Sequence, residues 1–444
     1  MAHKDLREFT KALESGSDLI TVDDEVDWDQ ELAGIGRLSC ERDGPAFMFN
    51  NVKDYAGWRG LANPVSGWRR YAVALGLPAS TPVREMYKIY AEREQNPIPP
   101  TLVNSSPCKD VIIPESDIDL FDLPVPMVHD GDGGRYLGTW DLVISKDRDS
   151  GWVNWGMYRF MIHDERHLTG YPRPNSHLGK MLLDGYAPAG EPMPIAIVIG
   201  ADQPSHLSST ATFRIGGDEI VVEAEIYPDK IAQEGPYGEY PGYRSGEMGN
   251  SVCARVTAIT HRKDPIFTID TTGFMDSSAV TTSISGAIAI RRRLERYDIP
   301  VSEVYIPPES GVHMAIVSVR RGGPDIAQKV VEILTARRAL MSKIIVVDED
   351  VDVFNMSAVI HAFSTKCHPE RGTHVHTYEG RANALTPAYS QEERVNQLGA
   401  SVAFDATWPP DWPVGSTPIR ATLDSMYSQD VQDRVNARWN KLGL

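Results

Sequence analysis

The middle of the chain carries the feature that most restricts its fold. Between residues 110 and 275, six short runs rich in β-branched and aromatic residues follow one another, separated by Gly, Pro or Asp: TWDLVIS, WGMYRFMIH, MPIAIVIG, EIVVEAEIY, VCARVTAIT and PIFTIDTTG. Runs of this length and spacing are typical of antiparallel strands in a barrel or a sandwich. The sequence therefore predicts a β-rich domain at the centre of the chain.

The flanking segments show other patterns. The first hundred residues alternate helix and strand patterns, beginning with a helix over DLREFTKALESG that Gly16 ends. A Pro- and Ser-rich stretch, NPIPPTLVNSSPC, predicts a domain boundary near residues 96–110. From residue 280 onward, helix and strand patterns alternate as in an α/β domain. We therefore predict a multidomain α+β and α/β protein, with domains over residues 1–105, 106–300 and 301–444.

Composition excludes several classes of protein. A chain of 444 residues is too long for one ordinary core, and its formal net charge of -17 argues against nucleic acid or an anionic membrane as the main partner. No apolar run is long enough for a transmembrane span, and the N-terminus lacks the apolar block of a signal peptide. The four cysteines lie far apart without a CxxC pair, which indicates a reducing cytoplasm.

Three motifs rich in potential metal ligands are better explained as ordinary structure. HDERH, residues 163–167, has its acid at the wrong offset for a helical zinc motif and reads as a turn. The histidines of KCHPERGTHVHTYEG alternate as on a strand. VVDEDVDVF lacks the Gly and the final Glu of a calcium loop. The Gly-rich HDGDGGRYLG, residues 129–138, fits either a structural turn or a loop that approaches a ligand.

The segment EGPYGEYPGY, residues 234–243, holds two glutamates among turn-forming residues. Gly235, Pro236 and Gly238 allow the chain to fold back, so that Glu234 and Glu239 converge. Converging carboxylates repel, which favours a proton on one of them and makes it a candidate general acid. An arginine beside the other carboxylate would keep it ionised. On the residues alone, a solvated acidic turn is the alternative.

Asn154 and Arg159 interrupt the apolar run GWVNWGMYRFMI. Strand alternation would place Arg159 on one face with Met157 and Met161. A guanidinium in partly apolar surroundings needs a carboxylate partner, because burying it unpaired is costly. This argument fits a ligand site and an edge-strand salt bridge equally well.

Taken together, these motifs resemble the UbiD family of decarboxylases, which use prenylated FMN. EGPYGEYPGY resembles the family's E-G-P-[FY]-G-[ED]-x-x-G-Y motif, and Asn154 with Arg159 its N-x4-R motif. GPAFMFNNVKDYAG, GEPMPIAIVIGADQP and VVDEDVDVFN match further blocks in the family's order, so the resemblance covers essentially the whole chain. It implies a central split β-barrel that binds flavin, an N-terminal α/β region and a C-terminal α/β oligomerisation domain.

The resemblance also implies the site. Arg159, Glu234 and Glu239 match the family's catalytic Arg-Glu-Glu network. The positions that match cofactor contacts are Asn154, Met157, Tyr158, Arg159, Tyr171, Pro172, Arg173, Ser176, His177 and Glu219. Arg173 is open to two roles, as a ligand of the flavin or of a second substrate carboxylate or hydroxyl.

Asn154, His177 and Glu219 match the family's metal ligands, with Mn²⁺ as the metal and K⁺ often nearby. The stretch between Glu219 and Glu234 is shorter than in most relatives. An alternative alignment puts Glu219 on the later strand and leaves the metal one ligand short. Ser401 stands where many relatives have a lysine.

The activity that the resemblance implies is reversible, non-oxidative decarboxylation of an aromatic or heteroaromatic carboxylic acid through a covalent adduct with the flavin. The cofactor supplies the electron sink that side chains lack. Glu239 would donate or accept the proton, and Arg159 with Glu234 would orient the site. The implied partners are the acid, CO₂ and a UbiX-type flavin prenyltransferase, with assembly as a homodimer or homohexamer. The alternatives are an FMN-dependent oxidoreductase and a flavin-binding subunit without activity.

Overall fold

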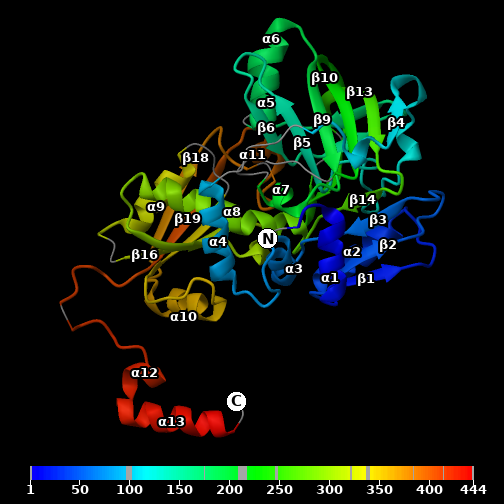
Figure 1. The fold of residues 1–444 in the computed structure, drawn as a ribbon. Helices are drawn as coiled ribbons and strands as arrows, with labels where there is room; N and C mark the ends of the chain where they lie inside the picture. The colour runs from blue at the N-terminus through cyan, green and yellow to red at the C-terminus, as the bar shows by residue number, and fades with distance from the viewer. Residues whose placement is uncertain are drawn as a thin grey trace.

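The computed structural model describes residues 3–96, 103–174, 176–208, 218–245, 249–320, 323–336, 341–383, 385–413 and 415–442. Figure 1 shows a β-rich part beside the N-terminal helices and strands, and an α/β part on the other side of the central helix α8 (Ser277–Glu295). The mixed α/β architecture predicted from the sequence is confirmed. Residues 97–102 of the predicted boundary stretch lie outside the described residues.

The N-terminal part is a small sheet with helices around it. Its elements are α1 (Leu6–Ser15), β1 (Leu19–Val22), α2 (Glu31–Glu41), β2 (Ala46–Phe49), β3 (Arg59–Ala62), α3 (Trp68–Ala74) and α4 (Val83–Gln95). The side chain of Asp5 caps α1 and the predicted Gly16 follows its last residue. The sheet order is β1-β2-β3-β14, so β14 (Ile266–Ile269), from the predicted central segment, completes the N-terminal sheet.

The central part is dominated by one long-stranded sheet of order β6-β5-β9-β10-β13-β8-β7, with β4 also paired to β13. Its strands are β4 (Val111–Pro114), β5 (Asp141–Lys146), β6 (Val153–Gly156), β7 (Phe160–Ile162), β8 (His167–Gly170), β9 (Met193–Ile199), β10 (Ile220–Glu234) and β13 (Gly249–His261). Short helices accompany it: η1 (Pro107–Lys109), η2 (Glu115–Asp117), η3 (Leu120–Asp122), α5 (His177–Lys180), η4 (Met181–Tyr186), α6 (Ala187–Ala189) and α7 (Gln203–Ser208). β11 (Tyr237–Glu239) and β12 (Tyr243–Ser245) form a separate hairpin.

The two edge strands of this sheet are close in the sequence. Only residues 157–159 connect β6 to β7, and that connection reaches no further than about 15 Å. The sheet must therefore curl until its edges approach each other. Because β6 and β7 do not pair in the described chain, no closed barrel is found, and the split barrel stays a prediction. The expected strand through 155–162 is also interrupted, since 157–159 lie between β6 and β7.

The C-terminal part is a five-stranded sheet of order β15-β16-β17-β19-β18. Its elements are β15 (Val301–Tyr305), η5 (Pro308–Ser310), β16 (Met314–Val319), α9 (Ile326–Thr335), β17 (Lys343–Asp348), α10 (Met356–Lys366), β18 (Thr373–Tyr378), α11 (Gln391–Val395) and β19 (Gly399–Ala406). The three central strands are parallel and nearly continuous in apolar residues, as expected for strands covered on both faces by helices.

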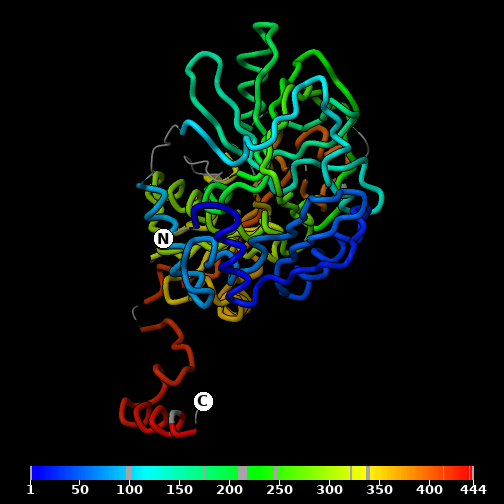
Figure 2. Tube along the Cα trace, turned by 45° about the vertical axis from the view of Figure 1, so that its right-hand side comes forward, coloured from blue at the N-terminus to red at the C-terminus, as the bar shows by residue number. Residues whose placement is uncertain are grey.

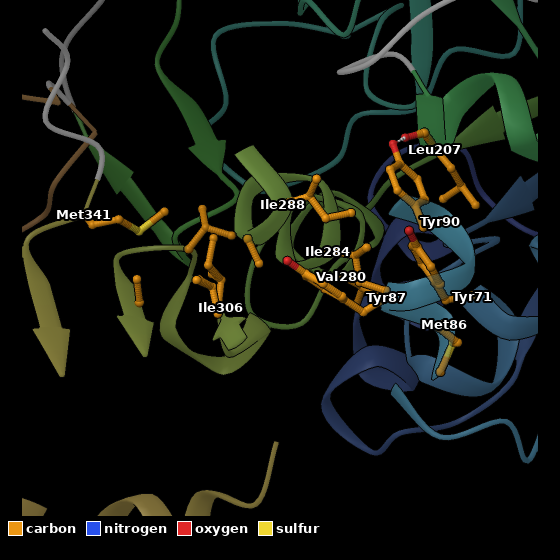
Figure 3. Close-up of a cluster of buried hydrophobic side chains, with 14 of the residues drawn as sticks. Tyr71, Met86, Tyr87, Tyr90, Leu207, Val280, Ile284, Ile288, Ile306 and Met341 are labelled. Carbon is orange, nitrogen blue, oxygen red and sulfur yellow. Dashed lines mark hydrogen bonds between the residues drawn. The ribbon is translucent and has the colours of Figure 1, made fainter. Parts of the chain in front are cut away.

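One apolar cluster joins the three parts. It includes Tyr90 of α4, Leu207 of α7 and Ile284 of α8, together with strand residues of the C-terminal sheet. Figure 3 shows these side chains around α8, where the hydroxyl of Tyr90 donates a hydrogen bond of 2.6 Å to the carbonyl oxygen of Leu207. Because α8 packs against elements from all three parts, this shared core fixes their relative positions.

The C-terminal segment lies apart from this core. In Figures 1 and 2, α12 (Leu423–Met426) and α13 (Gln429–Lys441) project away from the rest of the molecule. Their apolar side chains, including Met426, Val435 and Trp439, are exposed. Among the described helices, none combines the length and the apolar character needed to cross a bilayer.

Candidate active site

Arg159 holds the two glutamates of the EGPYGE segment together. Its Nη2 donates a hydrogen bond of 2.8 Å to Oε2 of Glu234, and its Nη1 donates to Oε1 of Glu239. Glu234 is the last residue of β10, while Glu239 ends β11 after a turn at Gly235, whose φ is +85°. The predicted convergence of the glutamates is therefore present, and Arg159 lies between them.

The two carboxyl groups are not equivalent. Burial raises the pKa of Glu239, since the positive charges of Arg159 and Arg173 only partly offset it and Glu234 opposes ionisation. Burial works against the charge of Arg159, but the carboxylates of Glu239 and Glu234 outweigh it and raise the arginine's pKa. The side chain of Glu239 is 12% exposed. A carboxyl group whose pKa is raised, beside a permanently charged arginine, is a suitable general acid.

Tyr136 fixes the orientation of Glu234. Its hydroxyl donates a hydrogen bond of 2.8 Å to Oε1 of Glu234, and its ring centroid lies 4.1 Å from that of Tyr237. The Tyr237 ring also lies under the guanidinium of Arg159, at 5.2 Å. Burial and the neighbouring Glu234 raise the pKa of Tyr136, which keeps it a donor. Tyr136 was not among the residues predicted from the sequence, where its only signal was its place within the Gly-rich turn.

That Gly-rich turn, residues 129–138, supports the hairpin. Oδ1 of Asp132 accepts a hydrogen bond of 2.9 Å from the backbone N–H of Gly238, and Oδ2 lies 2.9 Å from Nδ1 of His129. A Cβ on Gly133 would approach the carbonyl oxygen of Gly235 to 1.9 Å, so no larger residue fits there. Of the two readings that the sequence left open, the structural turn accounts for these contacts.

Asn154 and His177 form a second group of donors. Oδ1 of Asn154, on β6, lies 3.1 Å from Nδ1 of His177, the first residue of α5. Ser176 caps α5 through a 3.1 Å hydrogen bond from the N–H of Gly179. The hydroxyl of Tyr158 accepts a hydrogen bond of 3.2 Å from the N–H of Leu178, which ties the loop after β6 to α5. The segment 154–159 and the segment made of 171–174 and 176–178 therefore lie side by side.

The remaining predicted cofactor residues belong to the same two segments. Met157, Tyr158, Pro172 and Arg173 are partly buried, and Tyr171 is exposed. Amide, imidazole, hydroxyl and guanidinium groups gathered there are donors of the kind that bind a phosphorylated cofactor. This set of side chains fits the phosphate end of a flavin nucleotide.

Glu219 lies elsewhere. It immediately precedes β10, its side chain is fully buried, and it accepts two hydrogen bonds of 2.9 Å from Arg7. Nε of Arg262 lies 3.3 Å from its Oε1, and the backbone N–H of Ile266 donates to its Oε2. The structure does not bring Glu219 to Asn154 and His177, which matches the alternative alignment with one metal ligand missing.

The other ligand-rich motifs have structural surroundings. His163 and Asp164 lie in the turn between β7 and β8, where Nδ1 of His167 is 2.9 Å from Asp164. Asp348 at the end of β17 pairs with Lys366 at 3.0 Å. Within the described ranges, no three His, Cys, Asp or Glu side chains are grouped closely enough to hold a metal ion.

Comparison with known protein families decides the assignment. Three family models match this chain: the N-terminal domain of 3-octaprenyl-4-hydroxybenzoate carboxy-lyase over residues 10–89, its Rift-related domain over 101–219 and 215–274, and its C-terminal domain over 280–406. The chain belongs to the UbiD family of carboxy-lyases. Its resemblance to that family, seen first in the sequence motifs, is confirmed.

Individual UbiD relatives extend over nearly the whole chain. A phenolic acid decarboxylase of Bacillus subtilis is 31% identical, with 83% of this chain and 86% of the relative aligned. A pyrrole-2-carboxylic acid decarboxylase of Pseudomonas aeruginosa is 27% identical, with 99% and 98% aligned. The UbiD-class enzyme HmfF of Pelotomaculum thermopropionicum in complex with FMN has a TM-score of 0.80 at 25% identity, covering 94% of this chain and 97% of that one.

A vanillic acid decarboxylase of Sedimentibacter hydroxybenzoicus, in its closed form, has the same fold with a TM-score of 0.84 at 24% identity, covering 100% of this chain and 99% of that one.

The match to the Rift-related domain model is broken into two segments, which overlap at residues 215–219, directly before β10. A break there is expected if UbiD relatives carry a segment that this chain lacks. The position fits the shortened stretch seen in the sequence and the separation of Glu219 from Asn154.

Proposed function

We propose that this chain catalyses the reversible, non-oxidative decarboxylation of an aromatic or heteroaromatic carboxylic acid, with prenylated FMN as its cofactor. The observation that carries the proposal is the bridge from Arg159 to both Glu234 and Glu239, of which Glu239 has a raised pKa. Decarboxylation needs an acid that can deliver a proton to carbon, and this arrangement supplies one.

Loss of CO₂ from an aromatic ring leaves an electron pair that no side chain can accept, and the prenylated flavin would supply the electron sink. The donors that converge beside α5 support its binding there. Asn154, Ser176 and His177 would bind its phosphate, while Met157 and Tyr158 would contact its ring system.

Glu239 is the proton donor in this scheme. Its raised pKa keeps a larger fraction protonated near neutral pH than in an ordinary glutamate. After CO₂ leaves, Glu239 gives its proton to the ring carbon, and in the reverse direction it removes that proton. Since its side chain is nearly buried, few water molecules compete for the proton.

Arg159 and Glu234 act as an orienting pair. The guanidinium contacts both carboxyl groups, so it fixes the position of Glu239 relative to the bound ring. Tyr136 holds the other oxygen of Glu234 and prevents it from rotating away from Arg159.

This chain brings together only part of the ligand set expected for the family's metal. Asn154 and His177 converge, but Glu219 is held by Arg7 and Arg262, so the full three-residue set for Mn²⁺ does not assemble. We therefore assign no step of the reaction to Mn²⁺ or K⁺.

The remaining elements of the proposal concern the setting of the enzyme. The enzyme would work in a reducing cytoplasm, as the wide spacing of its four cysteines indicates. The cofactor would come from a UbiX-type flavin prenyltransferase. Assembly into homodimers or homohexamers would use the C-terminal domain.

Expression with and without a flavin prenyltransferase tests the proposal. The purified protein is assayed with a panel of aryl and heteroaryl acids for CO₂ release, and its ultraviolet-visible spectrum reports the bound flavin. We expect CO₂ release only after co-expression. Flavin reduction by NAD(P)H without CO₂ release would identify an FMN-dependent oxidoreductase instead. Bound flavin without either activity would identify a non-catalytic subunit.

A further inference from the structure

Gly238, the residue directly before Glu239, is held at both of its backbone polar groups. Its N–H donates a hydrogen bond of 2.9 Å to Oδ1 of Asp132, and its carbonyl oxygen accepts one of 2.6 Å from Oγ1 of Thr272. Asp132 comes from the Gly-rich turn, while Thr272 lies in the loop between β14 and α8. Two segments that are distant in the sequence therefore meet at the backbone of Gly238.

His129 joins these two partners of Gly238 to each other. Its Nδ1 lies 2.9 Å from Oδ2 of Asp132, and its Nε2 lies 3.0 Å from the carbonyl oxygen of Thr272. The four contacts form a closed cycle, here called the Gly238 clamp, which runs through Gly238, Asp132, His129 and Thr272. Because each member is bound on two sides, none can shift without loss of a hydrogen bond.

The clamp is buried and closely packed. The side chain of Asp132 is fully buried, and Gly238 and Thr272 are buried as well. A Cβ on Gly238 would approach Nδ1 of His129 to 2.5 Å, so the imidazole lies directly against the backbone of the hairpin. A polar network that is satisfied and shielded from water is rigid. The clamp is therefore a firm support for β11.

The partners of His129 also fix where its hydrogens lie. The carbonyl oxygen of Thr272 can only accept a hydrogen bond, so Nε2 of His129 donates to it. A carboxylate oxygen of Asp132 can only accept as well, so Nδ1 donates to that oxygen. The clamp therefore closes with a hydrogen on both ring nitrogens of His129, which gives it a spectroscopic signature.

The clamp acts on the part of Glu239 that Arg159 does not hold. Arg159 donates to the carboxyl group of Glu239, whereas the clamp fixes the backbone from which that side chain extends. A general acid must lie within hydrogen-bonding reach of the atom that it protonates, and a misplacement of about 1 Å can cost about 100-fold in rate. Both contacts are therefore needed to set the position of the acid.

We propose that His129, Asp132 and Thr272 are positioning residues for proton transfer, which hold Gly238 so that the carboxyl group of Glu239 meets the reacting carbon. This inference rests on the proposed decarboxylase function and adds three residues that act through the hairpin backbone. Opening the clamp should slow the proton transfer and leave the binding of acid and flavin unchanged.

Substitutions in the clamp test this role. Thr272→Val keeps the shape of the side chain and removes its hydroxyl, whereas Thr272→Ser keeps the hydroxyl. His129→Phe removes both ring donors. Thr271→Val is the matched control, because Thr271 belongs to the same loop and its buried hydroxyl accepts a hydrogen bond from Asn63 and not from the hairpin.

Turnover is measured in the prenylated-flavin form with the acid that releases CO₂ fastest in the panel. Thr272→Val and His129→Phe should each lower kcat by about 10- to 100-fold, while KM and the affinity for FMN stay within about twofold of the wild type. Thr272→Ser and Thr271→Val should keep most of the wild-type kcat. The double variant of Thr272→Val and His129→Phe should be no slower than the poorer single variant, since either change opens the clamp.

Two further measurements do not depend on turnover. Amide hydrogen exchange of peptides that contain β11, followed by mass spectrometry, should be faster in Thr272→Val and His129→Phe than in Thr271→Val. In protein labelled with ¹⁵N-histidine, NMR should show a hydrogen on both ring nitrogens of His129. The signals of His129 are identified by their absence in His129→Phe.

Four results would overturn the inference. They are a wild-type kcat in Thr272→Val, equal losses of kcat in Thr272→Val and Thr271→Val, unchanged exchange at β11, and a hydrogen on only one ring nitrogen of His129. A wild type that releases no CO₂ would instead refute the proposed function alone. In that case hydrogen exchange would still decide whether the clamp holds the hairpin.

Discussion

Arg7 and Glu219 form a buried ion pair that joins the first helix to the start of β10. Nε and Nη2 of Arg7 each donate a 2.9 Å hydrogen bond to a different oxygen of Glu219, and Arg7 also reaches Asp264 at 2.9 Å. The carboxylate of Glu219 is fully buried, and Arg262 approaches it from another side. These contacts give Glu219 structural partners, and Asn154 and His177, with which the family resemblance groups it, contact each other elsewhere.

Glu219→Gln should therefore destabilise the fold. It leaves the guanidinium groups of Arg7 and Arg262 without their carboxylate, and breaking a buried pair costs on the order of 3 kcal/mol. Urea denaturation measures the loss, and a double-mutant cycle with Arg7→Met separates the coupling from other effects. Glu8→Gln, on the exposed side of α1, is the control. A stability equal to the wild type would contradict the structural role.

Mn²⁺ binding should be independent of Glu219. In the FMN-loaded protein, Asn154→Ala or His177→Ala should weaken Mn²⁺ binding by about tenfold or more, because ligand loss costs at least as much as loss of an outer partner. Glu219→Gln should leave the Mn²⁺ affinity unchanged in the folded protein. Titration followed by electron paramagnetic resonance measures free Mn²⁺. A large loss of Mn²⁺ affinity in Glu219→Gln would show instead that Glu219 completes a three-ligand site.

Tyr136→Phe should reduce turnover while leaving the fold intact. The substitution keeps the ring packed against Tyr237 and removes only the donor to Glu234. Loss of a hydrogen bond to a charged group should lower kcat by about tenfold. Tyr237→Phe is the matched control, because it removes a hydroxyl that bonds to Thr272 and not to a carboxylate. Equal kinetic effects of the two variants would count against an orienting role for Tyr136.

Asp218 should make stability depend on pH. Burial, reinforced by the negative charge of Asp202, raises the pKa of Asp218 from 3.8 to about 7 in the folded protein. The folded state therefore binds the proton more tightly than the unfolded chain. Its contribution to stability is complete below pH 3.8 and is lost as the pH rises through about 7.

Asp218→Asn should remove the dependence of stability on pH that Asp218 causes. The melting temperature of the wild type should fall between pH 5 and pH 8 relative to that of Asp218→Asn, by about 2–4 °C for a chain of this size. Asp110→Asn, an exposed acid in the same part of the chain, should follow the wild type. If the melting temperatures of the wild type and Asp218→Asn changed with pH in the same way, Asp218 would not titrate in this range.

Local sequence patterns predicted much of the fold. Capping by Gly16 correctly ended α1, and the β-branched runs became β5, β9, β10, β13 and β14. The placement of β14 in the N-terminal sheet was not predictable, because pairing of strands distant in the sequence depends on which apolar faces meet. The break at 157–159 was also missed, since apolar alternation continues through it.

Some residues of the candidate site could be picked out from the sequence, and others could not. Arg159, Glu234 and Glu239 stood out because a charged residue in an apolar run and two acids around a tight turn each need an explanation. Tyr136 did not, because a tyrosine beside glycines carries no signal until its hydroxyl is placed against Glu234. The resemblance to the UbiD family implied Glu219 as a metal ligand, but its partners Arg7 and Arg262 come from distant segments that a match of motifs does not reveal.

Proton transfer by Glu239 is the central claim, and isotope exchange tests it most directly. Glu239→Gln and the wild type, both loaded with prenylated flavin, are incubated in D₂O with the decarboxylated product, and deuterium at the ring carbon is followed by NMR. Glu239→Gln keeps the size of the side chain and removes the proton donor, so we expect the flavin spectrum to remain and both exchange and CO₂ release to disappear. Exchange at the wild-type rate in Glu239→Gln would contradict the account.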